Sequence, residues 1–68
     1  MSTYALFWER NEITGMWNKS RYFRAVNDSR AVAQAVGFIG DEPRWKLCKV
    51  GYRGTVIRVV AEIDNIEE

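Results

Sequence analysis

Residues 27–43, NDSRAVAQAVGFIGDEP, hold the pattern that decides the fold. Arg30 and Gln34 lie on one side of a helix drawn through this stretch, which predicts that this side is solvated. The small side chains of the opposite side allow close packing on a sheet. They recur at the i, i+3, i+4 and i+7 spacing of one helix face: Val32, Ala35, Val36 and Ile39.

The ends of this helix are also marked in the sequence. Asn27 or Asp28 can cap its first turn, because a short side-chain oxygen accepts hydrogen bonds from the free first-turn N–H groups. Gly37 and Gly40 weaken the other end, and Pro43 cannot continue the helix. A helix of about eleven residues is marginal on its own, so we expect it to dock on other elements.

The segments before the helix are predicted strands. Residues 3–10 are rich in β-formers and apolar on both faces, which indicates either a central strand or a strand whose second face is covered by a partner. Residues 20–26 alternate apolar and basic side chains, as a strand with one solvated face does. The loop between them, residues 11–19, carries Ile13, Met16 and Trp17. Such a loop either folds back on the core or presents a contact surface.

Two further strands, at 45–50 and 55–63, are predicted after the helix, joined by a turn at 51–54. In the last strand, alternation predicts one set of side chains toward the helix: Ile57, Val59, Ala61 and Ile63. The other set is expected to face away: Val56, Arg58, Val60 and Glu62. The order strand, strand, helix, strand, strand (ββαββ) predicts a two-layer α+β fold. Its antiparallel sheet has about four strands and carries one helix on one face.

Length and charge limit what this fold can do. Sixty-eight residues predict a single compact domain, 1–68, with an acidic C-terminal tail at 62–68. Ten Lys and Arg against nine Asp and Glu give a net charge of +1. The tail holds four acids and no base, so residues 1–61 carry ten bases against five acids, or +5. The tail is either solvated or folds back over this basic body.

The residues needed for common catalytic chemistry are missing. The chain has no histidine, which removes the commonest general base and the commonest metal ligand. Its serines therefore have no histidine to activate them. Carboxylate pairs remain, but so short a chain has little material for a cleft of several hundred Å³. We expect no enzymatic activity, no catalytic residue, no metal site and no cofactor.

The single cysteine and the hydropathy pattern point to a cellular compartment. Cys48 alone permits neither an intrachain disulfide nor a zinc cluster, and it is expected to be a core residue. The chain shows no signal peptide, and no apolar run approaches the length of a membrane span. These features predict a cytoplasmic protein that does not bind membranes.

A basic and aromatic run at residues 44–58 suggests a nucleic-acid interface. It contains no acid, and its positive charges can contact phosphates while its aromatic rings stack on bases. The alternative is a solvated sheet face whose Lys and Arg stems cover apolar surface. The candidate nucleic-acid-binding residues are Arg44, Lys46, Lys49, Tyr52 and Arg53.

A protein-binding surface is the competing hypothesis. Three Trp, three Tyr and three Phe are more aromatic residues than one helix can cover on so small a sheet. Trp, Tyr and Arg also dominate binding hot spots. The candidate partner-binding residues are Trp17, Tyr22, Arg24, Arg53 and Arg58. Open sheet edges also allow strand pairing, so a homodimer through an edge strand is a further possibility.

The arrangement of Tyr4–Trp8, Tyr22–Val26, the helix after Asp28 and Thr55–Ile63 resembles that of a known group of small proteins. These are phage and mobile-element accessory proteins of the anti-CRISPR inhibitor type. The resemblance concerns architecture and carries no functional residue across. It implies a phage-encoded inhibitor that evades host defence by blocking a host protein or nucleoprotein complex through surface contact. Inhibitors that mimic DNA are strongly acidic, whereas this body is basic, so we expect contact with a protein surface.

Overall fold

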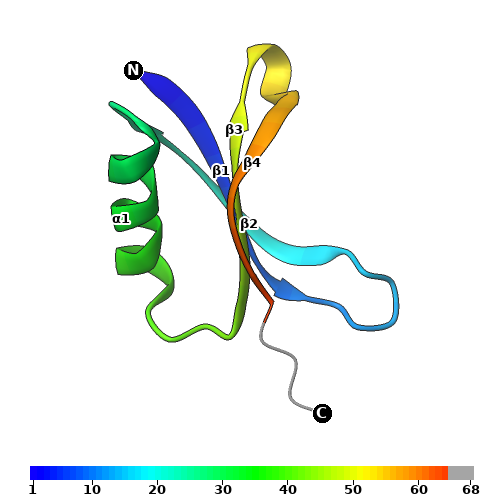
Figure 1. Ribbon diagram of the computed structural model, residues 1–68. Coiled ribbons are helices and arrows are strands. Elements are labelled where there is room, and N and C mark those ends of the chain that lie inside the picture. Colours follow the sequence, from blue (N-terminus) through cyan, green and yellow to red (C-terminus); the bar gives the residue numbers. More distant parts are fainter. Residues whose placement is uncertain (65–68) are drawn as a thin grey trace.

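In the described part of the chain, four antiparallel strands form one sheet in the order β2-β1-β3-β4, with a single helix on one face (Figure 1). The computed structural model describes residues 1–64. Its elements are β1 (Ser2–Arg10), β2 (Trp17–Ala25), α1 (Asp28–Ile39), β3 (Arg44–Val50), the 3-10 turn η1 (Tyr52–Gly54) and β4 (Val56–Asp64). The predicted α+β fold and its ββαββ order are confirmed. The predicted acidic tail overlaps β4 at residues 62–64, and residues 65–68 lie outside the described part.

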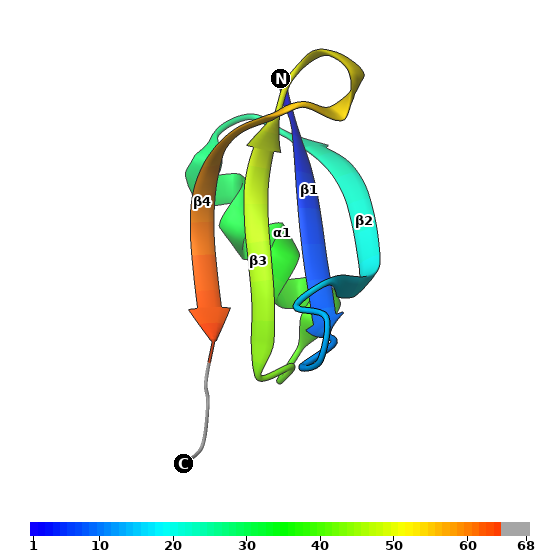
Figure 2. The ribbon, with the colours of Figure 1, turned by 90° about the vertical axis from the view of Figure 1, so that its right-hand side faces the viewer.

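The strand that is apolar on both faces, β1, lies inside the sheet. It pairs with β2 on one side and with β3 on the other. The connection from β2 to β3 contains α1, and this helix lies over one face of the sheet (Figure 1). Figure 2 shows the opposite face, with the helix behind the strands. We call this opposite side the open face.

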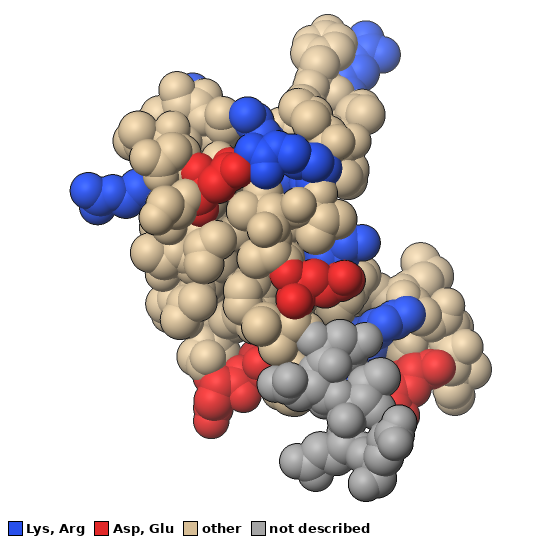
Figure 3. Space-filling view, in the orientation of Figure 1, with Lys and Arg blue, Asp and Glu red and all other residues tan. Residues whose placement is uncertain are grey.

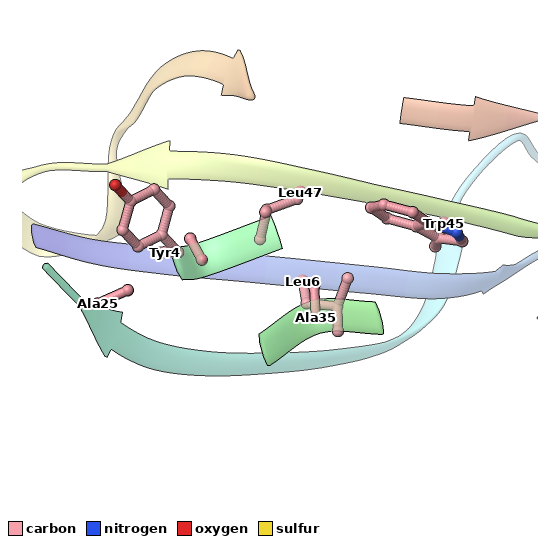
Figure 4. Close-up of a cluster of buried hydrophobic side chains, with 7 residues drawn as sticks. Tyr4, Leu6, Ala25, Ala35, Trp45 and Leu47 are labelled. Carbon is pink, nitrogen blue, oxygen red and sulfur yellow. The ribbon is translucent and has the colours of Figure 1, made fainter. Parts of the chain in front are cut away.

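The main core lies between the sheet and α1. Tyr4, Leu6 and Leu47 are fully buried there. From the helix, Ala31 and Ala35 meet them and are fully buried, and Val32 and Ile39 pack alongside while partly buried. Figure 4 shows the sheet residues directed to one side, with Ala35 placed against them. Because alanine is small, the helix backbone can approach the sheet closely, as the sequence predicts.

The helix is rotated slightly from its predicted orientation. Ala31 and Ala35 are buried, whereas Val36, a member of the predicted apolar stripe, is 48% exposed. Of the two candidate caps, Asn27 is the N-cap, and its side chain accepts a hydrogen bond from the Arg30 amide at 2.9 Å. Gly40 ends the helix, with a positive φ of 60° and its N–H bonded to the Val36 carbonyl.

Strand β4 departs from simple alternation at two points. Leu47 pairs with Ala61, but Cys48 pairs with Val59, so Val60 is an extra residue. A second shift between Lys49 and Val50 leaves Ile57 as another extra residue. Such β-bulges reverse the alternation of side chains beyond them. The predicted faces are therefore wrong for Arg58, Val59 and Val60.

The reversal explains where the β4 side chains lie. Val60 and Ala61 both pack against the main core. Arg58 pairs with Lys49, on the same face as Tyr4 and the helix. Val59 pairs with Cys48, on the open face, and is 47% exposed.

Candidate functional site: the open face of the sheet

The open face can be described as three rows that cross all four strands. Opposite residues of antiparallel neighbours point to the same side, so the strand register defines each row. The middle row is Tyr22, Ala5, Cys48 and Val59. The row toward η1 is Arg24, Thr3, Val50 and Val56, and the row toward the other end is Ser20, Phe7, Lys46 and Glu62.

This face has an apolar floor and apolar flanks. Ala5, Cys48 and Val50 on the central strands are buried and form a small second cluster with Phe7. The flanking strands carry larger residues that remain about half exposed. They are Tyr22 at 56%, Val56 at 51% and Val59 at 47%. Within residues 1–64 no helix covers them, so solvent contacts a contiguous apolar surface. Exposed patches of this kind are typical of interaction sites.

Two connections project beyond this face and make it a hollow. The η1 turn and the β1–β2 hairpin both extend to the side away from α1 (Figure 1). Figure 3 shows the hollow in outline at the right, between these two projections. The side chain of Tyr22 extends toward η1. Its hydroxyl would lie 3.7 Å from a Cβ atom placed on Gly54 of that turn. One aromatic side chain therefore links the edge strand β2 to the turn before β4.

Basic side chains lie around this apolar surface. Two basic residues, Arg24 and Lys46, lie in its outer rows. The same rows contain one acidic residue, Glu62, which pairs with Lys46. In η1 the Arg53 guanidinium carbon lies 5.3 Å from the centre of the Tyr52 ring, and Tyr52 is 82% exposed. The surface thus combines exposed apolar groups with an excess of positive charge.

The structure brings together some of the predicted partner-binding residues and separates others. Tyr22 and Arg24 share the open face, and Arg53 lies in the turn above it. Trp17 begins β2 at the base of the hairpin, half-buried, with the Arg10 guanidinium carbon 5.9 Å from its ring. Arg58 does not face this surface, because the bulges place it on the helix side. Phe7, Val56 and Val59 complete the surface instead.

Arg58 is instead part of a polar network at the helix N-terminus. Its Nη2 donates to Oδ2 of Asp28, and the Tyr4 hydroxyl donates to Oδ1 of Asp28 at 2.7 Å. The hydrogen bond from Tyr4, together with the Arg58 guanidinium, lowers the pKa of Asp28. The same bond, followed by burial, raises the pKa of Tyr4. This network joins three elements and has the character of a structural clamp.

The predicted nucleic-acid-binding residues are dispersed. Lys46 faces the open side and Lys49 faces the helix side. The two residues are three positions apart in β3, and side chains an odd number of positions apart in a regular strand point to opposite faces. Arg44 pairs with Glu12 at 3.2 Å, near the other end of the sheet from η1. In Figure 3 the Lys and Arg side chains are scattered among Asp and Glu over the visible surface. The basic run that is continuous in sequence is therefore not continuous in space.

The β1–β2 loop is shorter than predicted, and its tip is exposed. Residues 11–16 form the loop, because Trp17 pairs with Arg10 and extends β2. Ile13 is 96% exposed and Met16 is 68% exposed. Of the two alternatives for this loop, the structure favours the one in which its tip faces solvent.

A groove lies at the end of the sheet near the helix C-terminus. Its volume is about 940 Å³, and its walls include Val36, Trp45 and Ile63 with carboxylates at the rim: Glu9, Glu12, Asp41 and Glu42. The chain was expected to have little material for a cleft of several hundred Å³, and this groove reaches that size as a depression open to solvent. No group of three or more His, Cys, Asp or Glu side chains in residues 1–64 is arranged to hold a metal ion.

Cys48 lies in the floor of the open face. It is buried, as predicted, and burial raises the pKa of its thiol. The thiolate needed for nucleophilic chemistry is thus disfavoured.

Comparison with protein-family models, with curated proteins and with solved structures found no match. None of the helices within residues 1–64 has the length and apolar character needed to cross a membrane.

Proposed function

We propose that this chain is a non-enzymatic binding protein whose open face contacts a protein partner. The observation that carries the proposal is a set of large apolar side chains left half-exposed on the sheet face that no helix of residues 1–64 covers: Tyr22, Val56 and Val59. Leaving such groups in water has a free-energy cost that a partner removes on binding. Tyr22 and Arg24 supply the residue types that are enriched in hot spots.

A protein partner fits this face better than a nucleic acid. Phosphate binding calls for adjacent cations, and the register separates Lys46 from Lys49 on opposite faces. Single-strand binding also calls for aromatic rings along a basic groove. On the open face the neighbours of Tyr22 are Ala5 and, farther along the row, Cys48 and Val59, which are apolar.

The finer proposal concerns what the contact achieves. The architectural resemblance to phage accessory proteins supports a phage-encoded inhibitor that acts in the host cytoplasm. In that role the open face covers a functional surface of a host protein or nucleoprotein complex. Blocking by contact requires no catalytic group, which agrees with the absence of histidine from the chain.

A matched pair of substitutions tests the binding surface. Val59→Glu places a charge on the open face, and Val36→Glu places the same charge on the helix, where the starting exposure is nearly the same (47% and 48%). A photo-crosslinking residue at position 22 captures the partner from host lysate, and purified partner is then titrated. We expect Val59→Glu to weaken binding about tenfold or more, and Val36→Glu to leave it within about twofold.

Titration with oligonucleotides over a salt series distinguishes the protein-binding proposal from the alternative, a nucleic-acid-binding module. Binding to single- or double-stranded DNA that weakens as salt rises, and that Val59→Glu leaves intact, would establish the nucleic-acid module and reject the protein-binding proposal. Equal loss of protein binding in both valine variants would place the contact surface elsewhere. Sedimentation at increasing concentration tests the predicted edge-strand homodimer.

A further inference from the structure

The tip of the β1–β2 hairpin presents two aliphatic side chains to solvent on a fixed backbone. Ile13 is 96% exposed and Met16 is 68% exposed. The tip projects to the same side of the sheet as the open face (Figure 1). A side chain as apolar as isoleucine gains nothing from such a position within the monomer, because it contributes almost no buried area.

Several hydrogen bonds hold the loop in one conformation. The Asn11 N–H donates to the Met16 carbonyl at 2.7 Å, and the Gly15 N–H donates to the Asn11 carbonyl at 2.8 Å. The Asn11 side-chain oxygen accepts from the amides of Ile13 and Thr14 at 2.8 and 3.1 Å. Gly15 adopts a positive φ of 76°, which closes the turn.

Side-chain contacts fix the hairpin relative to the sheet. Glu12 in the loop pairs with Arg44 of β3 at 3.2 Å, and Glu9 pairs with Lys19 across the hairpin at 3.1 Å. The tip is therefore ordered before any partner arrives. An ordered apolar side chain binds with a smaller loss of conformational entropy than a mobile one.

We infer that the hairpin tip is an apolar anchor, in which Ile13 and Met16 insert into an apolar pocket of a folded protein partner. This inference rests on the proposed function, because the same partner would cover the open face beside the hairpin. It adds a second contact element and the chemistry of its receptor, namely a concave apolar pocket.

Charge around the tip favours a protein pocket over a lipid surface. The ionised groups of the hairpin near the tip are balanced in sign: Glu9, Arg10, Glu12 and Lys19. Peripheral membrane segments combine apolar residues with an excess of Lys and Arg that attracts anionic lipid. A single myristoyl chain already gives only marginal membrane binding, and Ile13 with Met16 exposes less hydrocarbon than such a chain.

The test uses photo-crosslinking from three positions in the full chain. A crosslinking residue replaces Ile13 at the tip, Tyr22 on the open face, or Gln34 on the exposed side of the helix. After irradiation in host lysate, we expect the same protein to be joined to positions 13 and 22 and not to position 34. Peptide mapping of the purified adduct is expected to place the position-13 crosslink among apolar pocket residues of that protein.

A matched pair of variants measures the contribution of the tip. Met16→Ser and Val26→Ser remove side chains of nearly equal exposure, 68% and 67%, from the tip and from the position that follows β2. We expect Ile13→Ser and Met16→Ser each to weaken partner binding about tenfold, while Val26→Ser leaves it within about twofold. All three variants should retain the melting temperature of the parent, because the changed side chains are exposed.

Other results would overturn the inference. A crosslink from position 22 without one from position 13 would reject the anchor and leave the proposed function standing. Failure of both positions would reject both. Sedimentation with phosphatidylserine-containing vesicles that depends on Ile13 would assign the tip to membranes, and a crosslinked dimer from position 13 would assign it to a second copy.

Discussion

The hydroxyl of Tyr4, in the centre of the sheet, donates a hydrogen bond of 2.7 Å to Asp28 in the first turn of the helix. Arg58 of β4 donates to the other oxygen of the same carboxylate. Asp28 therefore joins β1, α1 and β4, and its negative charge also lies at the positive end of the helix dipole. Three elements far apart in the sequence are held at one point by this carboxylate.

The Tyr4→Phe variant isolates the hydrogen bond to Asp28. Phenylalanine keeps the buried ring and its stacking on Phe23, whose centroid lies 5.9 Å away. We expect a loss of about 1 kcal/mol in the free energy of unfolding, measured by urea denaturation, because the hydrogen bond disappears while water still reaches the partly exposed Asp28 carboxylate. Tyr22→Phe, at an exposed position, serves as the control and should leave the free energy nearly unchanged. Equal losses in both variants would contradict the clamp.

The same network predicts how stability depends on pH. The pKa of Asp28 is lowered by Tyr4 and Arg58, so its contribution is complete above its unfolded pKa of about 3.9. That contribution is lost as the pH falls through the lowered folded value. The pKa of Tyr4 is raised, so its contribution is complete below about 10 and is lost as the pH rises through the raised value.

Asp28→Asn should remove much of this dependence. We expect the parent to be more stable than the variant near neutral pH, and the difference to shrink in acid below about pH 4. Thermal melts at a series of pH values measure it. A difference that stays constant down to the acid limit would show that the ionised form of Asp28 does not carry the interaction.

Two glycines should respond to alanine in opposite ways. Gly37 lies inside α1, and a Cβ atom added there would meet no other part of the fold within 4 Å. Gly37→Ala should therefore stabilise the chain by about 0.5–1 kcal/mol through helix propensity. Gly54 has a φ of +77°, so Gly54→Ala should destabilise it by about 1 kcal/mol through backbone strain. Urea denaturation of both variants tests the pair, and the same sign in both would contradict it.

Cys48 should be protected from thiol reagents in the native protein. It is 1% exposed, and burial raises the pKa of its thiol, so little thiolate is accessible. We expect the native chain to react with an aromatic disulfide reagent at a rate lower by on the order of a hundredfold than the urea-unfolded chain. Equal rates would show that the floor of the open face admits solvent.

The alanines of the helix should not tolerate larger residues. Ala35 is fully buried against the sheet, and leucine there would push α1 away, at a cost of about 1–3 kcal/mol. Ala33→Leu is the control, because Ala33 is exposed on the same helix. Thermal denaturation of the two variants is expected to separate them clearly, and similar melting temperatures would disprove close helix–sheet packing.

Local patterns in the sequence were sufficient to predict the order of the elements. The cap at Asn27 or Asp28, the apolar period and Pro43 are all local signals, and the helix spans Asp28–Ile39, with Asn27 as its cap. The position of β1 inside the sheet followed from its two apolar faces. These features depend on residues near one another in the chain.

The candidate site depended on information that local patterns lack. A bulge in β4 is a property of its pairing with β3, and alternation within β4 alone predicts the wrong face for Arg58, Val59 and Val60. The dispersal of the basic run has the same origin, because its residues fall on different faces and ends of the sheet. Tyr22 and Arg24 were placed correctly together, since β2 pairs with β1 without a shift.

The two irregularities in β4 also affect how the protein behaves at high concentration. Val56, Ile57, Val59, Val60 and Ile63 form the kind of segment that seeds cross-β fibrils when it lies straight at a sheet edge. An interrupted hydrogen-bond ladder offers a poor template for an incoming strand. A variant that lacks both extra residues, Ile57 and Val60, would have a straighter β4 and should therefore be less soluble.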